Sequence, residues 1–179
     1  QRISALEKEL AKVSTPDIST PILRQLATGK QRVTKIHNRG NFRSQGDVVQ
    51  AATPKVFHQL KPRGETLDRL DFAKWIIDTK NPMTARVTVN RFWEQLFGIG
   101  IVQTSEDFGT QGELPSHPKL LDHLAIEFME HDWDVKWLLK KIVSSATYRQ
   151  SSKVTPQIQE LDPRNRKLSH GPRFRLSAE

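Results

Sequence analysis

Apolar residues recur at helical spacing in four blocks of the chain, and this periodicity predicts four helices. The blocks are 66–79, 82–97, 117–131 and 134–149. Each block starts at or directly after a residue that can cap a helix N-terminus: Thr66, Asn81, Ser116 and Asp134. Single helices of this length are marginally stable in water, so their apolar faces must pack together. The pattern therefore predicts a mainly α fold, a small bundle of about four helices.

A long loop rich in glycine and proline separates the second predicted helix from the third. Gly98 follows the last apolar position of the second helix and suits a left-handed C-terminal cap. The loop then covers residues 99–115. We expect it to hold one shape, because so much irregular backbone needs partners for its N–H and C=O groups. Four tryptophans are predicted to supply much of the core: Trp75, Trp93, Trp133 and Trp137.

The two ends of the chain carry weaker patterns. We predict a helix over 2–13, a short strand over 33–38, a turn-prone segment over 39–47, an extended loop over 47–65, a disordered stretch over 151–159 and helix starts in 162–171 and 173–179. The chain is accordingly divided into a basic, loop-rich N-terminal arm over 1–65, a helical core over 66–150, and a polar linker with the start of a truncated helical section over 151–179.

Composition narrows the chemistry open to this segment. The chain has no cysteine, which excludes disulfides, thiolate nucleophiles, Cys-ligated metals and covalent c-type haem attachment within it. No apolar run is long enough to cross a membrane, and no signal peptide opens the sequence. The chain begins without Met and ends inside a helix-like pattern, so we expect it to be an excerpt of a longer protein.

The net charge of +8 is concentrated near the N-terminus. Residues 1–65 hold 12 Lys/Arg against 5 Asp/Glu, whereas residues 66–179 hold 16 against 15. A cationic arm is compatible with binding of a polyanion such as nucleic acid. It is equally compatible with a solvated segment that packs on an acidic neighbouring domain, and charge alone is a weak signal of specificity. Nucleic-acid binding is therefore not the favoured interpretation.

Several segments together resemble one family of bacterial proteins. The central ones are NPMTARVTVNRFWEQLFGIGIV, EDFGTQGELPSHPKLLDHLAIEF and WDVKWLLKKIVSSATYRQSS. NRGNFRSQGDVVQAATPKVF before them, and DPRNRKL and RFRLSAE after them, extend the likeness. Over roughly Ile36 to Glu179 the chain is similar to the planctomycete-type PSD domain of unknown function.

This resemblance implies a setting and partners rather than a reaction. In that family the domain lies near the C-terminus of large exported bacterial proteins, which often carry a planctomycete cytochrome c domain upstream. The resemblance thus implies a periplasmic or otherwise exported location. It also implies that the partners are other domains of the same polypeptide, including a c-type cytochrome domain that would hold haem. We expect no cofactor in the present segment.

One candidate site lies on the second predicted helix. Arg86, Asn90 and Glu94 share a helix face, and Arg91 lies beside it. One hypothesis makes Arg86 and Arg91 donors to an anionic ligand that Asn90 orients. Arg149 would complete this site if the helices were antiparallel neighbours. The favoured alternative is structural: Arg86 and Glu94 brace the loop, and Asn90 bonds its buried backbone.

A second candidate lies in the loop and at the start of the third helix. Asp107, Glu113 and His117 form the acid/base cluster that lies outside a continuous helix. If the loop folds back, Asp107 and Glu113 could act as a hydrolytic carboxylate pair with His117 nearby. The favoured alternative is that Asp107 closes a turn before Phe108-Gly109 while the other two hold the loop in place.

A third pattern, His123, Glu127 and His131, follows one stripe of the third helix at a spacing of four residues. The outer two side chains start about 12 Å apart along a straight helix, too far to meet one ion. We therefore predict no metal site here.

These observations leave three hypotheses for function. The leading one is a non-catalytic helical module that packs against, or orients, a cytochrome-c-type or substrate-binding domain of a larger exported protein. The second is a hydrolase or lyase domain that acts on an anionic polysaccharide through the loop residues and the two arginines. The third is polyanion binding through the basic N-terminal arm. No strong catalytic signature is present, so the sequence favours a segment that is not itself an enzyme.

Overall fold

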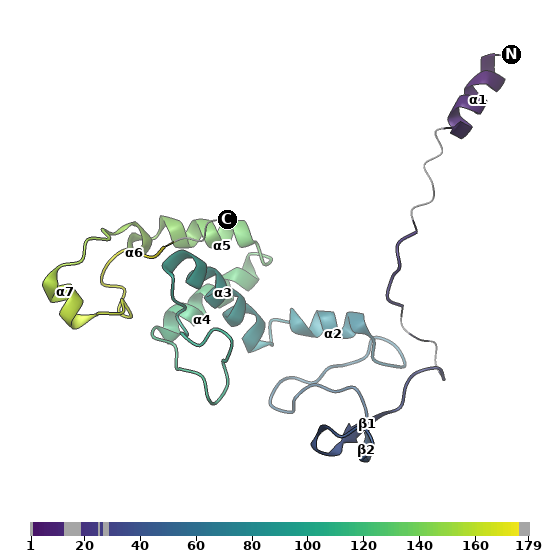
Figure 1. Cartoon of the computed structure of the whole chain (residues 1–179), viewed down its shortest axis with the longest axis horizontal. Coiled ribbons are helices and arrows are strands. Elements are labelled where there is room, and N and C mark those ends of the chain that lie inside the picture. The colour runs from purple at the N-terminus through teal and green to yellow at the C-terminus, as the bar shows by residue number, and fades with distance from the viewer. Residues whose placement is uncertain (1, 13–18, 25, 27–28, 176–179) are drawn as a thin grey trace. The chain divides into compact units, whose positions relative to one another are not determined.

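The computed structural model describes residues 2–12, 19–24, 26 and 29–175 (Figure 1). The chain divides into two compact units, Gln1–Gln50 and Ala51–Glu179. The described residues form seven α-helices and one two-stranded sheet, so the predicted mainly α fold is confirmed. No helix among these residues is long and apolar enough to cross a membrane.

The described residues of the first unit form one α-helix and one hairpin. Helix α1 covers Arg2–Lys12, as predicted apart from Val13, which lies outside the described residues. Strands β1 (Thr34–His37) and β2 (Gln45–Val49) pair antiparallel around the short 3-10 turn η1 (Asn38–Gly40). The predicted strand at β1 is confirmed. The prediction of turn and loop over β2 was wrong, because its sequence QGDVV has no strand pattern and only the pairing with β1 makes it one.

Helix α2 covers Arg69–Ile76 in the second unit. Its N-terminal cap is Asp68, not Thr66 as predicted. The Asp68 carboxylate accepts a hydrogen bond of 2.8 Å from the Asp71 N–H, and the Asp71 carboxylate accepts one of 3.0 Å from the Asp68 N–H. This reciprocal capping box fixes the start of α2 two residues later than expected.

Helix α3 covers Pro82–Phe97 and ends as the sequence predicted. The Asn81 side chain accepts from the Met83 N–H, and Gly98 adopts φ +78° at the C-terminal cap. Alanine at Gly98 would be strained by that φ and would place Cβ 2.9 Å from the Phe174 ring. The chain therefore turns sharply into the loop at Gly98.

Helix α4 covers Pro118–Glu130 and helix α5 covers Val135–Ser144. Ser116 does not cap α4: its hydroxyl donates to the Ile101 carbonyl, and His117 stands at the cap position without a side-chain bond. Asp134 caps α5 as predicted, by accepting from two backbone N–H groups. The predicted fourth helix is interrupted at Ser145, whose extended backbone ends α5 and caps the short α6 (Ala146–Arg149).

The C-terminal segment is more ordered than the sequence suggested. Helix α7 covers Pro156–Leu161 and begins inside the stretch predicted to be disordered, because Thr155 caps it and Pro156 suits its first position. The helix predicted from residue 162 is absent. Asp162 instead accepts bonds from the Arg166 and Lys167 N–H groups, which closes a turn. Residues 172–175 have no regular structure, and 176–179 lie outside the described residues.

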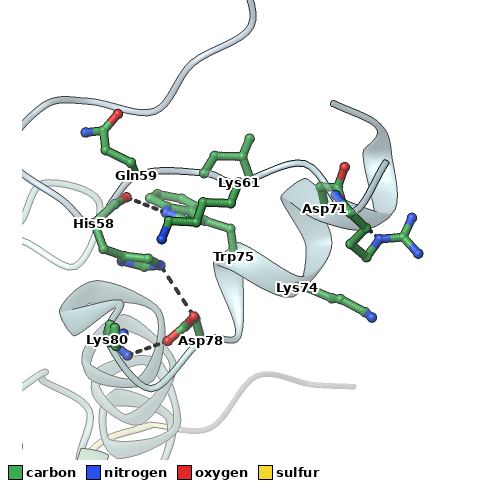
Figure 2. A pocket seen from close by; sticks show the side chains of 10 residues that line it. His58, Gln59, Lys61, Asp71, Lys74, Trp75, Asp78 and Lys80 are labelled. Atoms are coloured by element: carbon green, nitrogen blue, oxygen red, sulfur yellow. Dashed lines mark hydrogen bonds and ion pairs between the residues drawn. The ribbon is translucent and has the colours of Figure 1, made fainter. Parts of the chain in front are cut away.

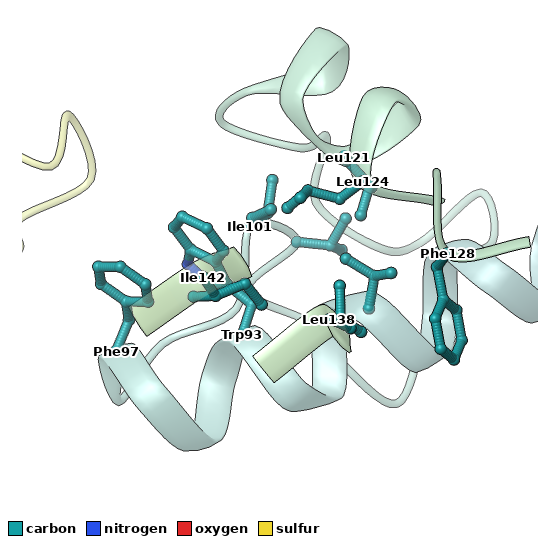
Figure 3. Packing of buried hydrophobic residues seen from close by; sticks show 10 residues of the cluster. Trp93, Phe97, Ile101, Leu121, Leu124, Phe128, Leu138 and Ile142 are labelled. Atoms are coloured by element: carbon teal, nitrogen blue, oxygen red, sulfur yellow. The ribbon is translucent and has the colours of Figure 1, made fainter. Parts of the chain in front are cut away.

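The core forms where α3, α4 and α5 pack on one another (Figure 3). Its buried side chains are Val89, Trp93, Phe97, Ile101, Val102, Leu121, Leu124, Phe128, Leu138 and Ile142. Trp133 and Trp137 pack against this cluster and are partly buried, as predicted. Trp75 was expected in the same core but packs instead against residues 57 and 58.

Leu138→Ala is expected to destabilise the second unit by about 3 kcal/mol, because Leu138 is fully buried and its truncation leaves a cavity. Leu161→Ala is the control, since Leu161 is 63% exposed; a change of about 0.5 kcal/mol or less is expected there. Urea unfolding followed by circular dichroism measures both, and equal losses would contradict the assigned core.

Candidate functional site

The loop after α3 is built around the side chain of Asn90. This amide is fully buried, and it bonds both the N–H and the carbonyl of Val102. Its Oδ1 accepts from the Val102 N–H at 2.8 Å, while Nδ2 donates to the Val102 carbonyl and to the Ser105 hydroxyl, both at 3.0 Å. The Asn90 side chain thus makes the hydrogen bonds to Val102 that a neighbouring strand would otherwise make.

Glycine lets the loop backbone come this close. A Cβ at Gly100 would collide with the Val102 carbonyl and the Asn90 amide, and a Cβ at Gly112 would collide with the Asp107 carbonyl. Arg166, from the C-terminal segment, donates to the Gly100 carbonyl at 3.0 Å. The loop is therefore held from both α3 and the end of the chain.

The acid/base residues of the loop do not bond one another. The Asp107 carboxylate accepts from the Gly109 N–H at 2.6 Å and closes a turn. Thr104 donates to the Asp107 carbonyl and accepts from the Glu113 N–H, so backbone groups fill this corner. The Glu113 side chain has no partner among the described residues, and the half-buried His117 ring lies 3.0 Å from the neighbouring Ser116 hydroxyl.

The predicted anion-binding arginines likewise do not share a partner. The Arg86 guanidinium donates to Asp122 at 2.6 Å and to the Pro82 carbonyl at 2.7 Å, so it ties α3 to α4 rather than bracing the loop. Arg91 is exposed and lies 3.7 Å from Glu106. In the part of the chain that the structure describes, the side chains of Glu94 and Arg149 form no hydrogen bond or ion pair.

The stripe of His123, Glu127 and His131 on α4 belongs to a polar and aromatic contact with α5. Lys141 donates to Glu127 at 3.0 Å, and this bond is the main reason that the pKa of Glu127 lies below its ordinary value. The His123 ring lies 3.2 Å from the same carboxylate, while His131 stacks on Trp137 with centroids 3.8 Å apart. The described residues include no group of side chains that could hold a metal ion.

A cleft of the second unit lies elsewhere, between residues 58–63 and α2 (Figure 2). Its volume is about 500 Å³, and it is lined by His58, Gln59, Leu60, Lys61, Arg63, Asp71, Lys74, Trp75, Asp78 and Lys80. The Trp75 indole N–H donates to the His58 carbonyl at 2.8 Å, and the two rings stack with centroids 5.3 Å apart. We call this region the His58 cleft.

Sequence reasoning missed the His58 cleft because it treated residues 47–65 as a plain extended loop. Thr53, which is buried, donates to the His58 carbonyl and accepts from the Leu60 N–H. These bonds fold the segment back onto α2. One signal was present: Trp75 falls outside the apolar stripe of its helix, so a second surface had to cover it.

Asp71 anchors one end of the cleft. It is 3% exposed and accepts from the Asp68 N–H and from Arg63, whose Nε lies at 2.6 Å. Burial raises the pKa of Asp71, but these bonds and the Arg63 charge outweigh burial, so the pKa lies below its ordinary value. Arg63 also donates to Asp68 at 2.7 Å, which holds the segment against the start of α2.

Comparison with known proteins gives one family match. Residues 68–179 match the family described as PSD1, Protein of unknown function (DUF1553). This confirms the resemblance found in the sequence over those residues. No curated protein and no solved structure matches the chain.

Asn90→Ala is expected to destabilise the second unit by about 3 kcal/mol, because it leaves the buried N–H and C=O of Val102 without partners. The matched control is Gln95→Ala, an exposed position on the same helix, where we expect little change. Urea unfolding compares the two. Similar stabilities for the two variants would show that the loop does not depend on this amide.

Asp71→Asn is expected to lower the free energy of unfolding at neutral pH and to matter less in acid. Because the pKa of Asp71 is lowered by folding, its stabilisation is present above the ordinary Asp value of about 3.9 and is lost as the pH falls through the lower folded value. Urea unfolding across an acid series measures this. The control is Glu160→Gln, an exposed carboxylate; an unchanging gap between wild type and Asp71→Asn would contradict the assignment.

Proposed function

The chain belongs to the PSD1 family of proteins of unknown function, and on that premise we propose that it is a non-catalytic helical module. The module packs against, or orients, another domain of the same polypeptide. The proposed partner is a cytochrome-c-type or substrate-binding domain of an exported protein. The observation that carries the proposal is the hydrogen bonding of the loop: Asn90 bonds Val102, and Thr104 and Asp107 bond backbone groups of the loop itself.

The contacts of the loop favour a structural role over a catalytic one. A hydrolytic pair needs two carboxylates that face one bond of the substrate, about 5 to 9.5 Å apart. Asp107 instead holds a turn, and the Glu113 side chain lies exposed without a partner among the described residues. The hypothesis of a hydrolase or lyase therefore draws no support from these residues.

The surface of α2 supports a docking role. Leu70 of α2 and Ile77, which directly follows the helix, lie seven residues apart and are 50% and 54% exposed. Among the described residues, α2 packs mainly on the segment that contains His58 rather than on another helix. An apolar helix side left open in this way is a suitable contact for a neighbouring domain.

The test is a double substitution, Leu70→Ser with Ile77→Ser, in the full-length polypeptide that carries this module. We expect the module and its neighbouring domain to unfold in one calorimetric transition in the wild type and in two transitions in the variant. Loss of the apolar contact removes the coupling between the two domains.

The control is Leu114→Ser with Leu161→Ser, which alters two apolar side chains that are 88% and 63% exposed away from α2. This variant is expected to keep the single transition. Deletion of residues 51–179 gives a second readout. If the remaining domains kept their fold and all their activity after the deletion, the proposed role would be wrong.

A further inference from the structure

We propose that the His58 cleft binds a small ligand that carries an oxyanion, namely a phosphate, sulfate or carboxylate group. This inference does not depend on the proposed docking role, because it concerns another group of side chains. It rests on three features of the cleft: unpaired cations, a histidine with unused ring nitrogens, and a wall that is already fixed.

The charges of the cleft favour an anion. Four lining residues are cationic and two are acidic. Asp71 is occupied by Arg63 and by the Asp68 N–H. Within the described residues, Lys61 and Lys80 form no ion pair and no side-chain hydrogen bond. The cleft therefore holds ammonium groups without a carboxylate partner, and these attract an anion.

His58 provides hydrogen-bonding capacity that the fold does not use. Both of its ring nitrogens are shielded from solvent, and neither has a hydrogen-bond partner. The nearest candidate is Asp78, at 3.7 Å from Nε2, too far for a hydrogen bond. Figure 2 shows the ring directed toward Asp78, which also accepts from the Lys80 N–H. A buried polar group without a partner needs an explanation, and a hydrogen bond between the ring and a ligand oxygen supplies one.

His58 stabilises the fold through its backbone carbonyl and through the stacking of its ring, not through its ring nitrogens. Its carbonyl accepts from the Trp75 indole at 2.8 Å and from the Thr53 hydroxyl at 3.3 Å. Its ring stacks on Trp75, and Phe72 stacks on the same indole. The imidazole is thus held in place before any ligand arrives, which lowers the entropic cost of binding.

The size of the cleft sets the class of ligand. A volume of about 500 Å³ lies within the range of about 300–1,000 Å³ that is usual for small-molecule sites. Inorganic phosphate would leave most of this space empty, whereas a phosphorylated or carboxylated sugar would fill more of it. The shared chemistry is the oxyanion, and the choice of probes separates a free ion from an anion carried on a larger body.

The experiment is an NMR titration of residues 1–179 that follows the histidine ring signals and the amides of residues 58–80. The probes are inorganic phosphate, sulfate, glucose 6-phosphate and glucuronate, with glucose as the uncharged counterpart. We expect saturable shifts with at least one anion, at dissociation constants in roughly the millimolar range, and no shifts with glucose. Glucose 6-phosphate binding more tightly than inorganic phosphate would identify an anion on a larger body.

Two sets of variants localise the site. Lys61→Gln with Lys80→Gln is expected to weaken binding about ten-fold, whereas Lys119→Gln with Lys153→Gln, the same charge change at exposed positions elsewhere, changes it about two-fold or less. His58→Phe keeps a ring on Trp75 but removes the nitrogens. It is expected to weaken binding about five-fold or more while the melting temperature stays equal or rises, because an unpaired buried polar group is lost.

The proposal fails if the wild type shows no saturable shift with any anion. It also fails if the two lysine double variants bind equally well. A His58→Phe variant that unfolds at a lower temperature and binds as tightly as wild type would assign the imidazole a purely structural role, which contradicts the inference as well.

Discussion

The bonds between the Asn90 amide and Val102 are the constraint on which the second unit depends. One fully buried side chain satisfies both backbone groups of a residue in a loop that has no strand or helix partner. Because that residue also belongs to the apolar core, the same bonds place Val102 and Ile101 among the side chains of α3, α4 and α5. Without the amide, the core would close over unpaired backbone groups, which is energetically costly.

The C-terminal segment depends on this corner and stabilises it in turn. Arg166 reaches the Gly100 carbonyl, and Phe174 lies against Gly98. Gln150 donates to the Leu168 carbonyl, which brings the segment back toward α6. The loop is consequently held on several sides, and its polar groups act as internal structure. A rigid corner of this kind suits a module that transmits position between domains.

The His58 cleft differs from this corner in how its polar groups are used. There the carbonyl of His58 and the indole of Trp75 stabilise the fold, while the imidazole nitrogens have no hydrogen-bond partner and two lysine ammonium groups have no ion pair among the described residues. The buried Asn90 amide at the loop has partners within the chain, whereas the ring nitrogens of His58 in the cleft have no hydrogen-bond partner. This contrast separates a structural corner from a candidate binding site more clearly than residue type does, since both regions contain histidine and aspartate.

The sequence by itself determined the local features: the helical class, the caps at Asn81 and Asp134, and the left-handed turn at Gly98. These follow from bonds and dihedral angles within a few residues. Only the tertiary structure decided that β2 is a strand, that Arg86 pairs with Asp122, and that His58 lies against Trp75. The last two of these contacts join residues that lie more than 15 positions apart in the sequence. Their formation depends on which surfaces meet after folding, and periodicity and residue type do not carry that information.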